Sequence, residues 1–306
     1  MAFNLATLTP FTDEVSFGLI SEAVLGAQIL KYAQCRPGFS AGTVAINILT
    51  SDLAVDDASC GWNPGGTSSF TQVDLTIVDK QVKESYCPED LRAYWLSSQL
   101  SAGGQLDTVP FADAIAALKV KQIQKYVETI IFQGDGGNLT GLIADITHGN
   151  GANAQSGAPA AAWTAANALT QAQAVVSGLP SQVLDRGDLI MYMSFASFRA
   201  LNQALVNANL FHYTAGDRGT GNSLANQTII IPGTNVLAVP FVGMGSSNRV
   251  ICGPSEYLII GTGLTGDYDA MDIFYDKYND VVKFMSKFRV GAKAAFVDYF
   301  VSNDLA

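Results

Sequence analysis

The longest run of regularly spaced apolar positions in the chain has the period of an α-helix and ends at a glycine cluster. Between residues 111 and 131 the apolar positions repeat at helical spacing, while three lysines and Glu128 take other positions around the helix. These apolar positions are Phe111, Ile115, Leu118, Ile123, Val127, Ile130 and Ile131. Gly134, Gly136 and Gly137 follow in QGDGGNLTGL, and glycine adopts left-handed and open conformations at little cost. The pattern predicts a stiff helix of roughly 33 Å that ends in a hinge at these three glycines.

Two alternating segments before this helix predict an extended β-hairpin over residues 43–80. Every second residue of each strand is aliphatic, and these positions are Val44, Ile46, Ile48, Val73, Leu75 and Ile77. Between the strands, residues 56–70 are rich in Gly, Ser, Asp and Asn and contain the turn sequence NPGG. A two-stranded ribbon alone is marginally stable in water, so we expect the hairpin to lie on another surface. The alternative is that it belongs to the chain's own sheet.

The last long pattern, from Met271 to Phe300, alternates with the period of a β-strand. One face holds Val282, Phe284, Ser286, Phe288 and Val290. The opposite face carries Lys283, Lys287 and Arg289, which predicts an extended ribbon with a basic side.

The remaining segments predict a mixed α+β chain. Residues 1–42 read as an arm with one short helix near residues 18–34, and residues 149–167 read as a loop. Further helices are expected over residues 88–100, 169–179 and 197–208, and strands over residues 188–193, 229–231, 236–241, 250–252 and 257–260.

The composition points to a chain whose surface is largely covered by partner subunits. Only 14% of the 306 residues are charged and 48% are hydrophobic, whereas about a quarter of residues are charged in an ordinary globular protein. Secreted proteins of low charge and cores rich in small residues have similar compositions, so these alternatives stay open. The net charge of −10 and the scattered 17 basic residues argue against a strong grip on nucleic acid, so we expect only weak, non-specific contact with DNA.

Neither a secretory signal nor a membrane span is expected from the sequence. The first residues, MAFNLATLTPFTDE, have no basic region followed by a continuous apolar one, and no apolar run approaches the roughly 18 residues of a membrane helix. The four cysteines are far apart and have no C-x-x-C spacing, so they read as free thiols of a reducing compartment.

No motif in the chain carries recognisable catalytic chemistry. Residues 261–266 fit G-x-G-x-x-G, but two aspartates follow where a pyrophosphate would lie, so the segment reads as a glycine-rich turn. His148 and His212 are the only histidines, and neither accompanies a nucleophile motif. We therefore predict no enzyme, no catalytic residue, no cofactor and no metal. Catalysis by a pair of carboxylates remains an alternative, because the 27 acidic residues allow many pairs.

Opposite charges gather in two separate parts of the chain. The hairpin region has no Lys or Arg between Arg36 and Lys80, and its acids include Asp56, Asp57 and Asp74. We expect these acids of one subunit to meet Lys283, Lys287 and Arg289 of a neighbour, which would guide assembly by charge complementarity. The plainer alternative is two ordinary solvated faces.

The order of these parts resembles that of the major capsid proteins of tailed bacteriophages, which have the Hong Kong 97-type fold that encapsulins share. The most specific local match is the long helix leading into GDGGNLTGL (residues 134–142), which is similar to the family's transition from helix to glycine turn. The segment from Gly263 to Phe274, followed by the ribbon over residues 281–290, is similar to the family's late peripheral strands. The resemblance covers nearly the whole chain through its architecture.

The resemblance implies an amino-terminal arm over residues 1–42 and an extended hairpin loop over residues 43–80, both acting as inter-subunit straps. It further implies a peripheral domain with the spine helix over residues 81–148 and 262–306, and an axial domain over residues 149–261. Copies of the chain would form pentamers and hexamers of an icosahedral shell around double-stranded DNA. Scaffolding, portal and cement or decoration proteins are expected partners, without a membrane. Assembly would take place in the host cytoplasm, and the final location would be the virion.

One family variation does not transfer to this chain. Some members form an isopeptide crosslink from a hairpin lysine, and this hairpin has no lysine between Arg36 and Lys80. Non-covalent burial or a cementing protein would then hold the shell. The alternatives to a phage capsid are an encapsulin-like compartment, another phage structural protein such as a tail-tube or decoration protein, and an enzyme.

Overall fold

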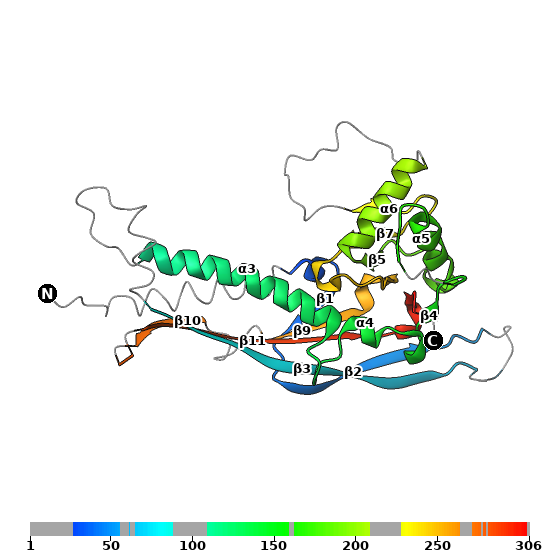
Figure 1. Cartoon of the computed structure of the whole chain (residues 1–306). Coiled ribbons are helices and arrows are strands. Elements are labelled where there is room, and N and C mark those ends of the chain that lie inside the picture. Colours follow the sequence, from blue (N-terminus) through cyan, green and yellow to red (C-terminus); the bar gives the residue numbers. More distant parts are fainter. Residues whose placement is uncertain are drawn as a thin grey trace.

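The described part of the chain contains two six-stranded sheets, one long helix and several shorter helices (Figure 1). The computed structural model describes residues 27–55, 61, 65–87, 109–158, 162–208, 228–263, 271–276, 278–279 and 281–304, without the side chains of residues 109–116, 271–273 and 275. The helix predicted over residues 88–100 and most of the predicted arm lie outside the described residues.

The first sheet has the order β1-β9-β11-β3-β2. Its strands are β1 (Gln34–Pro37), β2 (Gly42–Ser51), β3 (Ser68–Tyr86), β9 (Leu258–Thr262), β10 (Met271–Asp276) and β11 (Val281–Ala294). Strand β10 pairs with residues 281–286 of β11, on the side of β11 opposite β3. The 19-residue strand β3 pairs with β2 through its first half and with β11 through its second half. The predicted hairpin is therefore part of the chain's own sheet, which corrects the expectation that it lies on another surface.

The alternation of β2, β3 and β11 places the aliphatic residues of the predicted repeats on faces that are buried or half-buried, whereas Leu49 of β2 lies on the other face of the hairpin. Ile46, Leu75 and Ile77 pack with Ile259 of β9 in a small core at the base of the hairpin. From residue 284 to residue 290 of β11, Phe284, Ser286, Phe288 and Val290 are buried and the residues between them are half-buried, whereas beyond Val290 the alternation gives way to mostly buried residues.

Helix α3 (Val109–Gln133) confirms the long helix and lies along the ribbon of β10 and β11 (Figure 1). Ile123, Val127, Ile130 and Ile131 are buried, as predicted. Leu118 was predicted in the same apolar stripe but is 55% exposed. That prediction is wrong because the sheet covers only one side of the helix, and Leu118 lies on the other.

The second sheet has the order β4-β12-β8-β5-β7-β6 and carries helices α5 and α6. Its elements are β4 (Asn153–Ala154), α5 (Ala168–Ser177), β5 (Leu189–Met193), α6 (Phe195–Asn207), β6 (Ile229–Ile230), β7 (Leu237–Pro240), β8 (Ile251–Pro254) and β12 (Val301–Ser302). The structure confirms three predicted elements, with each end within two residues of the prediction. They are the helices over residues 169–179 and 197–208 and the buried strand over residues 188–193. Ser194 caps α6 by accepting a hydrogen bond from the backbone N–H of Ser197.

Short elements complete the described chain. They are the helix α4 (Leu142–Asp145) and 3₁₀ turns at Gln28–Lys31, His148–Asn150, Ser181–Val183, Val242–Met244, Ser255–Tyr257 and Val297–Tyr299. The helix predicted near residues 18–34 is wrong over its described end, because a single 3₁₀ turn there leads directly into β1. β1 is held by parallel pairing with β9, more than 200 residues away in the sequence.

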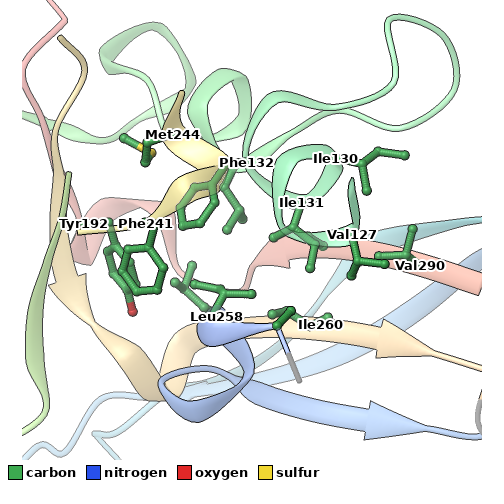
Figure 2. Packing of buried hydrophobic residues seen from close by; sticks show 14 of the residues in the cluster. Val127, Ile130, Ile131, Phe132, Tyr192, Phe241, Met244, Leu258, Ile260 and Val290 are labelled. Carbon is green, nitrogen blue, oxygen red and sulfur yellow. The ribbon is translucent and has the colours of Figure 1, made fainter. Parts of the chain in front are cut away.

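One core joins the two sheets through α3 (Figure 2). Phe132 of α3 packs against Tyr192 of β5 and Phe241, with ring centroids 6.2 and 5.2 Å away. Val127 and Ile131 meet Val290 and Ile260 of the first sheet in the same cluster. The predicted domain bounds stay predictions, although β1, β9 and β12 each join a sheet across one of those bounds.

Candidate assembly surfaces

The outer face of the hairpin displays apolar side chains to solvent. Leu49 of β2 and Phe70 of β3 stand opposite each other in the antiparallel register, 57% and 78% exposed. Leu53 and Val55, just beyond β2, are exposed as well. Apolar cross-strand pairs stabilise a sheet mainly where something covers them, and a grouped apolar patch commonly marks an interaction site. This outer face of the hairpin is therefore a candidate assembly surface.

Side-chain hydrogen bonds across the ladder hold the outer part of the hairpin in register. They join Gln72 Nε2 to Asn47 Oδ1 at 2.9 Å, Thr50 Oγ1 to Ser69 Oγ at 2.7 Å, and Ser51 Oγ to Ser68 Oγ at 2.8 Å. Such pairs add a few tenths to about 1 kcal/mol each. The exposed apolar pair is thus presented on an ordered ribbon.

The predicted glycine hinge is a tightly bonded turn. Gly134 and Gly136 have φ of +78° and +72°, the left-handed region that favours glycine, whereas Gly137 does not. The Asp135 carboxylate accepts hydrogen bonds from the backbone N–H groups of Gly137 and Leu139, both at 2.9 Å. A Cβ at Gly134 would lie 2.5 Å from the Leu139 carbonyl oxygen. The turn fixes one direction for the chain that leaves α3, and a hinge motion there stays a prediction.

Asp135 also ties this turn to the base of the hairpin. Its Oδ2 lies 2.8 Å from Lys80 Nζ of β3. The Lys80 ammonium and the two backbone N–H groups hold the pKa of Asp135 down at about 2, because each of them favours the charged carboxylate. Sequence inspection singled out the glycines of this turn but missed the aspartate between them.

Glu128 joins α3 to two other parts of the chain. Its buried carboxylate accepts hydrogen bonds from the backbone N–H groups of Gly243, Val242 and Gln28. Burial raises the pKa of Glu128, and these hydrogen bonds partly oppose that shift. Gln133 Nε2 donates to the Gly243 carbonyl oxygen at 2.8 Å. The only sequence signal for this residue was a lone acid in the second half of the helix.

Two of the three basic residues predicted at the subunit contact have partners within the chain. Lys283 Nζ lies 2.5 Å from Asp276 Oδ2, and Arg289 Nε lies 2.7 Å from Asp79 Oδ1. Lys287 makes no ion pair among the residues that the structure describes. The basic face of β11 is therefore partly neutralised by its own sheet.

The acidic half of the predicted contact is only partly described. Asp74 is exposed on the outer face of β3, opposite Ala45, whereas Asp56 and Asp57 lie outside the described residues. The structure does not bring Asp74 to the basic residues of β11 within one chain. The contact between subunits stays a prediction.

Two acids that the sequence did not single out fasten the carboxyl-terminal segment. Asp145 is buried, pairs with Lys293 and accepts from the backbone N–H of Ala294 at 3.1 Å. Asp304 lies 3.1 Å from Arg249 in an ion pair. No local pattern reveals these links, because the partners are more than 50 residues apart.

The motifs examined for chemistry have structural roles where they are described. The first two residues of the G-x-G-x-x-G match end strand β9, and its last three lie outside the described residues, as does His212. Cys35, Cys87 and Cys252 are free thiols, and Cys60 is not described. Within the described ranges there is no group of three or more metal-ligating side chains and no helix long and apolar enough to cross a membrane.

Comparison with known proteins relates the chain to viral shells by structure. No protein-family model and no curated relative matches the sequence. A chain of the satellite phage P4 procapsid, determined with a size determination protein, superposes with a TM-score of 0.54 at 12% identity, covering 94% of this chain and 98% of that one. The capsid of a native GTA particle matches with a TM-score of 0.53 at 13% identity, covering 90% and 95%.

A third solved structure extends the likeness beyond phage particles. The virus-like particle from Pyrococcus furiosus matches with a TM-score of 0.52 at 12% identity, covering 95% of this chain and 99% of that one. At such identities the likeness establishes the fold. Because each match spans about the whole of both chains, the shared fold includes both sheets and the long helix.

Proposed function

Because the chain has the Hong Kong 97-type capsid fold, we propose that it is a major capsid protein of a tailed phage. Copies of it would assemble into the icosahedral shell that encloses a double-stranded DNA genome. The observation that carries this proposal is the exposed apolar pair Leu49 and Phe70 on an ordered hairpin of a chain with this fold. An apolar face on a projecting ribbon is suited to lie on a neighbouring subunit.

The proposed division of labour follows the predicted parts. Residues 1–42 and 43–80 would be inter-subunit straps, residues 81–148 and 262–306 the peripheral domain, and residues 149–261 the axial domain. Pentamers and hexamers would close the shell, with scaffolding, portal and cement proteins as further partners. Because the chain has no lysine between Arg36 and Lys80, non-covalent burial would hold the hairpin in place.

The remaining expectations concern contents and place. A net charge of −10 supports weak, non-specific contact with packaged DNA, since a strongly basic lining would hold the genome. The chain would assemble in the host cytoplasm and end in the virion, as a structural protein without catalysis.

Electron microscopy of the purified protein tests this proposal. Closed shells with icosahedral symmetry are the expected result at concentrations where the subunit is folded. A folded protein that stays monomeric under all assembly conditions, including added scaffold from its own source, would overturn it.

A second candidate function is an encapsulin-like compartment that encloses a protein cargo. The observation that favours it is the match to the virus-like particle from Pyrococcus furiosus, at nearly the same TM-score as the phage particles. The contents of particles isolated from the native source separate the two functions. Nuclease-protected DNA supports the phage capsid, and a co-purifying enzyme without DNA supports the compartment.

A further inference from the structure

The side of α3 that faces away from the sheets carries both basic and apolar residues. Leu118 is 55% exposed, and Lys121 and Lys125 are exposed beside it. Residues spaced by three, four and seven positions lie on one side of a helix, so these three form a single face. We call Leu118, Lys121 and Lys125 the basic stripe. Tyr126 lies off it, because its ring packs edge-on against Phe288 of β11 with the ring centroids 6.2 Å apart.

The charge of the basic stripe is not neutralised within the described part of the chain. Lys119, at the edge of this side, pairs with Glu84 of β3 at 2.6 Å. Lys121 and Lys125 make no ion pair among the described residues. The sequence has no acid from Ala114 to Val127, and the carboxylate of the next acid on the helix, Glu128, is buried and bound to backbone N–H groups. The basic stripe is therefore suited to an acidic segment that also carries apolar side chains.

The described chain begins beside this stripe. Ala27 and Ile29 are buried in the main core, and the Gln28 backbone N–H donates to the Glu128 carboxylate. Glu128 lies three positions after Lys125 and seven after Lys121, which is the same side of the helix. The 26 residues before Ala27 are thus tethered next to the basic stripe.

The sequence of those residues has the complementary chemistry. Residues 1–26 contain Asp13, Glu14 and Glu22 and no Lys or Arg, and more than a third of them are aliphatic or aromatic. From Glu128 back to Leu118 is about 15 Å along the helix axis. A 26-residue segment can reach about 85 Å when extended, so its length permits it to cover the whole stripe.

We propose that in the unassembled subunit residues 1–26 bind to the basic stripe of their own chain. The acids pair with Lys121 and Lys125, and apolar side chains cover Leu118. The chain's own acidic hairpin does not compete, because it projects toward the opposite end of the molecule from this part of α3 (Figure 1). Because residues 1–26 and the basic stripe belong to one chain, their contact loses no translational entropy of association, and only the short connecting segment loses conformational entropy. This inference concerns the free subunit and does not depend on shell formation.

Zero-length crosslinking tests the contact and identifies its source. A carbodiimide joins a carboxylate to a lysine amine only where the two touch. The sample is an equal mixture of unlabelled and ¹⁵N-labelled full-length subunits at a concentration below assembly. The ion pairs Lys80–Asp135 and Lys119–Glu84 serve as internal controls, because the structure places each within 2.8 Å.

The expected products join Asp13, Glu14 or Glu22 to Lys121 or Lys125, with both peptides of a product carrying the same isotope label. Two outcomes would overturn the proposal. One is the absence of these products while both control pairs crosslink. The other is products with mixed labels, which would place residues 1–26 on a second copy.

Charge reversal supplies an independent readout by hydrogen exchange of the full chain. Lys121→Glu with Lys125→Glu should speed amide exchange in residues 1–26 by tenfold or more. The matched control is Lys83→Glu, an exposed lysine of β3 without an ion pair in the described chain, and it should leave the exchange unchanged. Adding Asp13→Lys, Glu14→Lys and Glu22→Lys to the double variant should restore slow exchange. Equal exchange in all variants would exclude an electrostatic contact with the basic stripe.

Discussion

Three glycines near the end of α3 allow backbone conformation and steric fit to be separated by mutation. Gly136 has φ of +72° and open space where a Cβ would lie. Gly141 has an ordinary φ of −74°, but its Cβ would overlap the backbone of residues 132–134. Gly134 combines φ of +78° with a Cβ 2.5 Å from the Leu139 carbonyl oxygen. Alanine at Gly136 therefore tests the cost of backbone conformation alone, alanine at Gly141 tests steric overlap alone, and alanine at Gly134 tests both.

The expected losses of unfolding free energy differ in a fixed order. Gly136→Ala should cost about 1–2 kcal/mol, the usual penalty of a left-handed residue with a Cβ. Gly141→Ala should cost about 3 kcal/mol, because backbone atoms cannot move aside as a flexible side chain can. Gly134→Ala carries both penalties and should cost about 4–5 kcal/mol.

Urea unfolding of the unassembled subunit, followed by far-UV circular dichroism, measures these differences. The transition midpoint should fall least for Gly136→Ala and most for Gly134→Ala, with an unchanged denaturant slope. A Gly141→Ala variant as stable as the wild type would refute the close backbone approach between residues 132–134 and 141. Equal costs at Gly134 and Gly136 would refute the steric distinction between them.

Three further perturbations test the surfaces. Leu49→Ser with Phe70→Ser should block shell formation by electron microscopy while circular dichroism stays that of the wild type; normal shells would show that the pair does not mediate assembly. Asp135→Asn should remove a stabilisation that is present above pH 3.8 and lost as the pH falls toward 2, because the folded pKa of Asp135 is about 2. Acid unfolding followed by tryptophan fluorescence compares the two proteins, and identical acid transitions would contradict the bonding of this carboxylate to Lys80. Lys287→Glu tests the predicted subunit contact without breaking an ion pair of the described chain, and sedimentation velocity should show impaired assembly of a folded subunit; unimpaired assembly would argue against that contact.

The sequence predicted those elements whose pattern is local. Ile123, Val127, Ile130 and Ile131 repeat at helical spacing, and all four are buried in α3. Leu118 was assigned to the same repeat but is exposed, because the sheet covers only one side of the helix and Leu118 lies on the other.

Local sequence patterns did not predict the strand that depends on pairing with a distant segment. Strand β1 at Gln34–Pro37 exists through its parallel partner β9, and nothing in those four residues marks a strand. On the candidate assembly surfaces, too, the sequence did not predict residues whose contacts are long-range. The glycines of the turn were visible in the sequence, whereas the roles of Asp135, Glu128 and Asp145 depend on partners 55 or more residues away.

The sequence by itself determined the long helix and its glycine stop, the two strands of the hairpin, and the alternating faces of β11. Each is set by side-chain spacing within a few turns or strand residues. Only the tertiary structure decided that the hairpin continues the chain's own sheet, that Lys283 and Arg289 are paired internally, and that Lys121 and Lys125 are left on an uncovered face. The physical reason is that burial and charge pairing depend on which distant segments meet, and a sequence records spacing along the chain without recording those distances.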